Sequence, residues 1–202
     1  MTISSIRLIA VLLVALGWGL SRCPSAIAAE GQTLANLAAK VKELVQRDEQ
    51  RLTEIFLDLH QHPELGFQET RTASIVAKEF QNLGYETHTG IGQTGVVGIL
   101  KNGDGPVVMF RGDMDALPVL EETGLPYASR ATGAAANGSL TPVMHACGHD
   151  AHVTFLIGVA KIMNELKDSW SGTLVLIAQP AEELIAGAQA MVKGGLYDKA
   201  PR

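Results

Sequence analysis

Apolar residues recur every three or four positions between residues 33 and 59, with charged residues between them. This spacing predicts an amphipathic helix. His62-Pro63-Glu64 predicts its end, because proline cannot continue a helix. A second amphipathic pattern over residues 70–83 predicts another helix, which Gly84 ends.

The apolar pattern then changes to that of strands. Residues 94–100 and 106–110 are short β-branched runs joined by Asn102-Gly103-Asp104-Gly105, a hairpin-like turn signal. The small and polar residues of 129–142 predict a surface loop. The remaining expected elements are a helix over 150–166, a strand over 173–178 and a helix over 186–193. Alternating helices and buried strands predict an α/β fold whose sheet is mostly covered by helices.

Residues 1–29 have the features of a signal peptide. Arg7 is followed by a 13-residue apolar run over 8–20, and Ala26-Ile27-Ala28 offers small residues for cleavage. The run is shorter than the ~20 residues that span a bilayer, so a retained anchor is the less favoured alternative. Lipidation at Cys23 is another, disfavoured by Arg22 directly before it. We expect cleavage after Ala28 or Ala29, export to the periplasm or the cell exterior, and no stable membrane insertion afterwards.

The expected mature chain, residues 30–202, forms one domain, because no repeat or long linker divides it. Loss of Arg7 and Arg22 changes the net charge from −5 to −7. An acidic surface argues against nucleic acid or an anionic membrane as partner. Cys147 is the one cysteine left in residues 30–202, so it can be a free thiol, an intermolecular partner or a ligand.

The run from Met144 to His152 is rich in side chains that can bind metals or take part in catalysis. It holds three of the six histidines, together with Cys147 and Asp150. Such side chains bind transition metals or act in hydrolysis, which favours a metallohydrolase. A nucleophile–base pair of Cys147 and His149 is the alternative, but their spacing of two suits shared metal ligation better.

Three clusters of ligand-type residues follow predicted strands or open a helix: Asp113-Met114-Asp115, Cys147-Gly148-His149-Asp150 and Glu182-Glu183. In open α/β sheets, functional groups gather beyond the carboxyl ends of strands. Two metal ions there could polarise a carbonyl and lower the pKa of a shared water. Neighbouring glutamates suit a division of roles, in which one binds metal and the other accepts the proton of the water.

Three other patterns are weaker indicators of function. Gly90 to Gly95 matches the dinucleotide fingerprint by letters, but it precedes a strand instead of leading from a strand into a helix. Arg111-Gly112-Asp113 spells an adhesion tripeptide, yet we expect it at the end of a buried strand. His60, His62 and His88 have no sequence partners, so we expect surface or hydrogen-bonded core histidines.

Five motifs in this order resemble the amidohydrolase branch of the aminoacylase/carboxypeptidase metallopeptidase family, which includes hippurate hydrolases, N-acyl-amino-acid amidohydrolases and auxin-conjugate hydrolases. The likeness runs from about Leu52 to the end of the chain. The motifs are Leu59-His60-Gln61-His62-Pro63-Glu64-Leu65-Gly66-Phe67, Gly92-Gln93-Thr94-Gly95-Val96-Val97, Arg111-Gly112-Asp113-Met114-Asp115-Ala116-Leu117-Pro118, Met144 through Asp150, and Gln179-Pro180-Ala181-Glu182-Glu183.

The resemblance implies a role for each matched residue. Metal ligands are Cys147, which bridges, with His149 and Glu183, while Glu182 is the general base. Asp115 orients a ligand, and Asp113 stands where related carboxypeptidases place a ligand histidine. The implied cofactor is a pair of divalent ions, zinc or manganese. The implied substrate is an N-acyl amino acid or peptide-like amide. His145 and His152 are expected to be structural or to support the ligands.

The resemblance also implies a longer protein. Family members have roughly twice this length, and beyond Gly194-Gly195-Leu196 they carry further ligand histidines and a lid or dimerisation domain. We therefore expect part of a dinuclear-metallopeptidase catalytic domain, with an exposed apolar sheet edge. A homodimer is expected only where the lid domain is present. The alternative is a catalytically inactive remnant or fragment of such an enzyme.

Overall fold

The computed structural model describes residues 24–135 and 137–201. Most of the expected signal peptide, residues 1–23, lies outside them. Two compact units meet between Glu43 and Leu44, within helix α2 (Pro24–Gln61). In the described part of the chain, no helix has the length and apolarity needed to cross a membrane.

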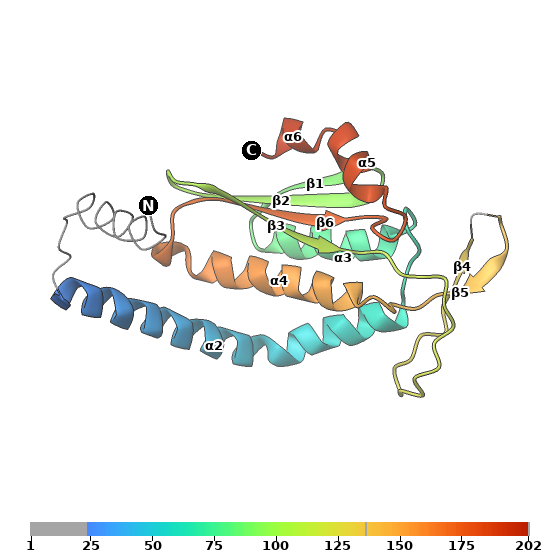
Figure 1. The fold of residues 1–202 in the computed structure, drawn as a ribbon, viewed down its shortest axis with the longest axis horizontal. Helices are drawn as coiled ribbons and strands as arrows, with labels where there is room; N and C mark the ends of the chain where they lie inside the picture. The colour runs from blue at the N-terminus through green and yellow to red at the C-terminus, as the bar shows by residue number, and fades with distance from the viewer. Residues whose placement is uncertain (1–23, 136, 202) are drawn as a thin grey trace, which may run out of the picture. The chain divides into compact units, whose positions relative to one another are not determined.

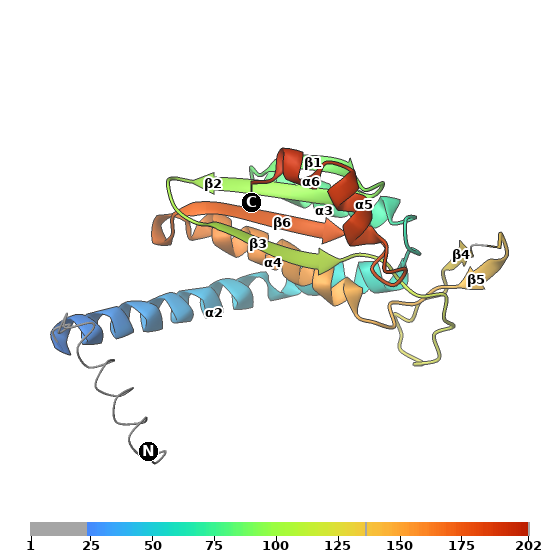
Figure 2. The same ribbon diagram turned by 45° about the horizontal axis from the view of Figure 1, so that its top comes forward.

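A four-stranded mixed sheet forms the centre of the second unit (Figures 1 and 2). Its order is β1 (Glu86–Ile91), β2 (Gly95–Asn102), β6 (Gly172–Gln179) and β3 (Val107–Asp113). Strand β2 is antiparallel to both β1 and β6, whereas β3 is parallel to β6.

The expected pairing of β2 with β3 across their tight turn is wrong, because β6 lies between them. Leu174 of β6 pairs with Leu100 on one side and Val108 on the other. The Thr173 N–H donates to the Pro106 carbonyl at 2.9 Å, so the connection between β2 and β3 crosses the start of β6. Strand β6 therefore takes the pairing that the turn alone would give to β3.

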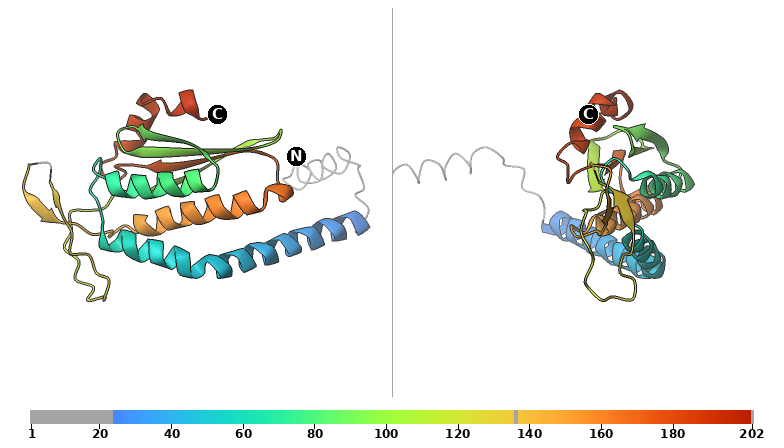
Figure 3. Two further views of the ribbon diagram at one scale, coloured as in Figure 1. Left: turned by 180° about the vertical axis from the view of Figure 1, so that it is seen from behind. Right: turned by 90° about the vertical axis from the view of Figure 1, so that its right-hand side faces the viewer.

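Helices cover both faces of the sheet (Figures 1 and 3). On one face α3 (Thr70–Asn82) packs on β1 and β2, and α4 (His149–Glu165) packs on β3 and β6. The short helices α5 (Gly187–Lys193) and α6 (Leu196–Lys199) lie on the other. The Leu44–Gln61 part of α2 packs against α4, where Asp48 accepts a 2.7 Å hydrogen bond from Lys161. A short 3-10 helix, η1 (Lys167–Ser169), follows α4.

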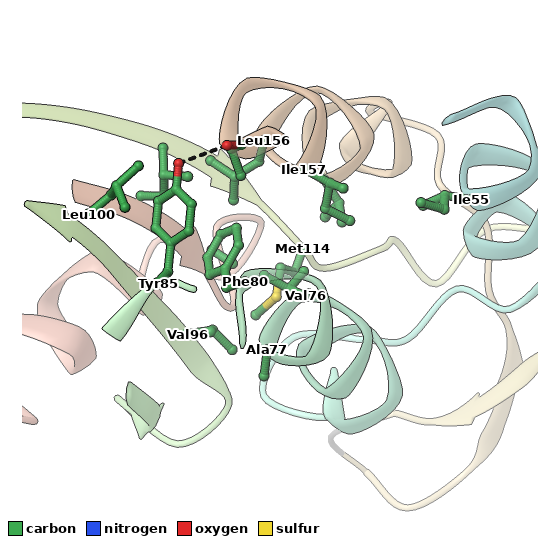
Figure 4. Close-up of a cluster of buried hydrophobic side chains, with 14 of the residues drawn as sticks. Ile55, Val76, Ala77, Phe80, Tyr85, Val96, Leu100, Met114, Leu156 and Ile157 are labelled. Carbon is green, nitrogen blue, oxygen red and sulfur yellow. Dashed lines mark hydrogen bonds between the residues drawn. The ribbon is translucent and has the colours of Figure 1, made fainter. Parts of the chain in front are cut away.

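Two hydrophobic cores explain why β2 and β6 are continuously apolar. In β6, Leu176 belongs to the core under α3 and α4, while its neighbour Ile177 belongs to the core under α5 and α6. A strand buried on both faces needs apolar side chains at every position. Figure 4 shows the first of these cores, in which the Tyr85 hydroxyl donates to the Ala160 carbonyl at 2.9 Å.

Strand β3 is the exposed edge of this sheet. Its four apolar residues are between 38% and 55% exposed: Val107, Val108, Met109 and Phe110. The expected apolar edge is therefore present. The expectation that Arg111-Gly112-Asp113 ends a buried strand is wrong, because burial begins only at Gly112. The α/β fold with helices over its sheet is confirmed.

The structure confirms each predicted helix to within a few residues, with α2 extending further toward the N-terminus than expected. The expected loop over 129–142 is only partly a loop, because β4 (Thr132–Ala134) and β5 (Leu140–Pro142) form a small antiparallel sheet. Strand β1 was not predicted, because its side chains are mostly polar and partly exposed. Helix α6, a single turn, was also not predicted.

Candidate metal centre

The turn into α4 presents Cys147 and His149. Gly148 precedes the helix with φ 79°, a left-handed conformation that glycine adopts without strain. Cys147 therefore stays outside the helix with an exposed thiol, while His149, the first helical residue, is buried. The turn places both side chains at the end of the sheet where β3 and β6 finish.

The turn after β6 presents Glu182 and Glu183. Pro180 ends the strand, and both Ala181 and Ile185 have positive φ, at 46° and 53°. The turn is so tight that a Cβ on Gly187 would lie 1.5 Å from the Pro180 carbonyl oxygen. Glu182 and Glu183 thus leave the strand toward the start of α4, with side chains 41% and 21% exposed.

These two turns bring three of the predicted ligands together. One ligand atom each from Cys147, His149 and Glu183 lies within 4.8 Å of the others. The Nε2 atom of His149 lies 4.0 Å from Glu183 Oε1 and 3.8 Å from Glu182 Oε2. This spacing leaves room for a cation between the groups, with Glu182 beside it.

Asp115 contacts two members of this group, His149 and Glu183. Its backbone carbonyl lies 2.8 Å from His149 Nδ1, and its carboxylate Oδ1 lies 3.3 Å from the same atom. Its Oδ2 accepts the Glu183 N–H at 2.9 Å. The Asp115 carbonyl, which accepts from Nδ1, assigns the proton to that nitrogen and leaves Nε2 free to bind a metal ion. Asp115 therefore contacts two of the three ligands, as an orienting residue would.

The charges of the site also suit a cation. Burial opposes ionisation of Asp115, but hydrogen bonds from His149 and from the Glu183 and Glu182 N–H groups outweigh it and lower the pKa of Asp115. A hydrogen bond to Glu183, burial and the surrounding acids raise the pKa of the Cys147 thiol. Oε1 of Glu183 is buried without a hydrogen-bond partner among the described residues. A divalent ion would balance this negative charge and supply the missing partner, so the residues fit a metal.

A proton would compete with a metal ion for His149. Burial disfavours the charged form of His149, but its hydrogen bonds with Asp115 outweigh that effect and raise the pKa of His149 to about 8. A ligand imidazole must be neutral at the nitrogen that binds metal. A metal ion at His149 would therefore have to displace a proton below about pH 8.

Comparison with known proteins agrees with this geometry. A family model described as peptidase family M20/M25/M40 matches residues 109–202. A hippurate hydrolase of Campylobacter jejuni is 46% identical over 142 residues, 70% of this chain and 34% of that protein. The chain belongs to the M20/M25/M40 peptidase family.

Two further relatives extend the likeness. An N-acetylcysteine deacetylase of Bacillus subtilis is 40% identical over 151 residues, 73% of this chain and 37% of that protein. The solved structure of a dinuclear metal binding peptidase of the M20 family, from Bacillus subtilis, matches with a TM-score of 0.67 and 37% identity. That match covers 76% of this chain and 41% of the solved one. The chain thus spans about a third of the length of the curated relatives named here.

A second group of candidate ligand side chains lies beside the first. Asp113, His149 and His152 also offer ligand atoms within 4.8 Å of one another. Asp113, at the end of β3, accepts a hydrogen bond from Arg111 and lies 3.5 Å from His152 Nδ1. The rings of His149 and His152 stack with centroids 5.2 Å apart. His152 therefore contacts the site, and its supporting role stays a prediction.

The other histidines differ from one another. His60 is buried, and its two ring nitrogens lie 2.7 Å from Asp150 and 3.2 Å from Glu121. It is thus the hydrogen-bonded core residue that we expected, but with acidic partners far away in sequence. His145 is also buried, without a hydrogen bond on either ring nitrogen among the described residues, and burial lowers its pKa to about 4.

Two acids near the site were not singled out from the sequence. Glu64 accepts the N–H groups of Arg71 and Thr72 at 2.9 and 2.8 Å, so it caps α3. Glu69 is completely buried and contacts the turn that carries Glu182. Glu64 lies within a quoted motif and Glu69 two residues after it, but the contact of Glu69 joins residues 112 positions apart.

Proposed function

We propose that this chain carries the N-terminal part of the catalytic domain of a metal-dependent amidohydrolase. The observation that carries the proposal is the convergence of Cys147, His149 and Glu183, with the His149 Nε2 atom free and Glu182 beside it. The relatives named as a hydrolase, a deacetylase and a dinuclear metal binding peptidase support it.

The proposed cofactor is a pair of divalent ions, zinc or manganese, that would polarise the scissile carbonyl and lower the pKa of a bound water. Cys147, His149 and Glu183 would hold this centre, with Asp115 orienting His149. Thiolate and imidazole favour zinc, whereas carboxylates also suit manganese. Asp113 and His152 form the adjoining wall.

Glu182 has the position of a general base. It neighbours the ligand Glu183, and its carboxylate lies 3.8 Å from His149 Nε2, near the space that the metal would share with water. Its side chain is 41% exposed, so substrate and solvent can reach it. In this role the carboxylate accepts a proton from the attacking water and transfers it to the leaving amine.

The proposed substrate class is an N-acyl amino acid or a related peptide-like amide. Hydrolysis would release a carboxylate and an amino acid. The support comes from the names of the relatives, a hippurate hydrolase and an N-acetylcysteine deacetylase. We also propose export to the periplasm or the cell exterior, on the basis of the pattern in residues 1–29.

A second candidate is a chain that binds metal without turnover. The open edge at β3 favours it, because the strand that leads to Asp113 and Asp115 has no neighbour on its outer side among the described residues. The wall of the site on that side is then incomplete.

The test compares the purified chain with its Glu182→Gln variant, loaded with zinc or manganese and supplied with N-benzoylglycine or an N-acetyl amino acid. We expect bound metal to stay unchanged and turnover to fall about 10²–10⁴-fold, because the base is lost while the ligands remain. Near-normal turnover in the variant would contradict the assignment of Glu182. Metal binding without turnover in the unsubstituted chain would favour the second candidate.

A further inference from the structure

Glu69 is a buried acid outside the group of predicted ligands. Its side chain is 0% exposed. One carboxylate oxygen accepts the Ala181 N–H at 2.8 Å, and the other accepts the Thr94 hydroxyl at 2.5 Å. A single carboxylate therefore joins the start of α3, the turn between β1 and β2, and the turn after β6.

Helix capping does not account for this carboxylate. Glu69 directly precedes α3, but its side chain makes no capping hydrogen bond. Glu64 satisfies the Arg71 and Thr72 N–H groups in its place. Glu69 is thus available for the turn after β6, and a buried acid needs such donors to offset the loss of water.

The turn after β6 needs this support. Ala181 is buried and has a φ of 46°, a left-handed conformation that is strained for a residue with a Cβ. Both backbone polar groups of Ala181 make hydrogen bonds. Its N–H donates to Glu69, and its carbonyl accepts from Ala186 and Gly187 at 3.3 and 3.1 Å. Such a conformation persists only where its surroundings hold it.

Two buried carboxylates therefore hold the two ends of the segment that presents the acids. Glu69 binds the N–H of Ala181, and Asp115 binds the N–H of Glu183, two residues later. Glu182 lies between these two points. The direction of the Glu182 and Glu183 side chains consequently depends on Glu69 as well as on Asp115.

We propose that Glu69 is a positioning residue of the metal centre, which holds Ala181 in its left-handed conformation and so directs Glu183 toward Cys147 and His149. This inference rests on the proposed function in one respect, namely that Glu183 would bind a metal ion. Its effect on the turn itself is independent of any metal.

The test uses the full chain and two measurements, Co²⁺ binding followed by the visible spectrum and hydrogen exchange at the Ala181 and Glu183 amides. In Glu69→Ala we expect Co²⁺ affinity to fall about 10–100-fold, the range for outer partners of metal ligands. We also expect the spectrum to change and both amides to exchange faster. Glu69→Gln keeps a carbonyl oxygen for the Ala181 N–H, so it should recover most of the affinity.

Asp48→Ala is the matched control, because Asp48 is also a buried acid, held by Arg47 and Lys161 between α2 and α4. It should lower stability without changing the Co²⁺ spectrum or the two amides. Unchanged Co²⁺ affinity and unchanged amide exchange in Glu69→Ala would overturn the proposal. If Glu69→Ala does not fold, Thr94→Val takes its place, because it removes the other hydrogen bond of the Glu69 carboxylate. Both amides should then exchange faster, and unchanged exchange in Thr94→Val overturns the proposal. Failure of the unsubstituted chain to bind Co²⁺ would instead count against the proposed function, while the amide exchange still decides the role of Glu69.

Discussion

Strands β6 and β3 are parallel neighbours of similar apolar composition, yet their surroundings differ. From Leu174 to Ala178, every residue of β6 is at most 4% exposed, whereas the residues of β3 from Val107 to Phe110 are 38–55% exposed. Strand β6 has a partner on each side and helices on each face, while in the described part of the chain β3 has a partner on one side only. An apolar run in the sequence therefore predicts a strand, whereas the topology decides whether that strand is covered.

The same difference extends to the site. Strand β6 leads to Glu182 and Glu183, in a turn that two buried carboxylates hold. Strand β3 leads to Asp113 and Asp115, and the surroundings of these two acids also differ. Asp115 contacts the predicted ligand His149, whereas Asp113 pairs with the half-exposed Arg111. The covered strand therefore carries the more firmly fixed part of the centre.

The largest expected effect comes from placing a charge in each strand. Leu176→Lys should cost about 3–5 kcal/mol or prevent folding, because Leu176 is completely buried and an unpaired charge there has no partner. Val108→Lys should cost no more than about 1 kcal/mol, because its side chain reaches water. Urea unfolding of both variants measures the difference, and equal losses would show that β3 is covered in solution.

A middle-sized effect should separate the two acids after β3. Asp115→Asn should weaken binding of Zn²⁺ about 10–100-fold, because it removes the charge that orients His149. Asp113→Asn should weaken it much less, since Arg111 already neutralises that carboxylate. Competition titration with a chelating dye measures both affinities. A larger loss in Asp113→Asn would reverse the order and make Asp113, His149 and His152 the main ligand group.

The smallest expected effect on stability is that of Val108→Lys, and the same substitution should clearly change self-association of the chain. Val108→Lys should reduce self-association of the chain, because a charge on an open edge opposes pairing with another strand. Val45→Lys on α2 is the matched control, since Val45 is similarly exposed but belongs to a helix. Light scattering against protein concentration measures association. A similar reduction in both variants would mean that general surface charge, and not the edge of β3, controls it.

Local patterns predicted the helices well, because their periodicity and end signals lie within the elements themselves. The spacing over 70–83 predicted α3, and that over 150–166 predicted α4, to within one residue at each end. The pairing of β2 and β3 could not be predicted, because β6 begins at Gly172, far along the chain from their shared turn.

The candidate site shows the same limit. The resemblance of three motifs to the metallopeptidase family predicted Cys147, His149 and Glu183 as ligands, and the structure brings these three side chains together. Their roles in catalysis stay predictions. Glu69 could not be found this way, since its importance lies in one hydrogen bond to the backbone of Ala181. A backbone contact between distant segments leaves no pattern in the order of side chains.

The insertion of β6 between β2 and β3 also has a consequence for how the chain folds. Residues 95–113 are complete long before Gly172 is synthesised, and their tight turn favours a direct antiparallel hairpin of β2 with β3. Such a hairpin would compete with the native pairing, because β6 lies between β2 and β3 in the folded sheet. Pairing of strands that are distant in the sequence is slow, so the apolar edges of β2 and β3 stay exposed to other chains until β6 joins them.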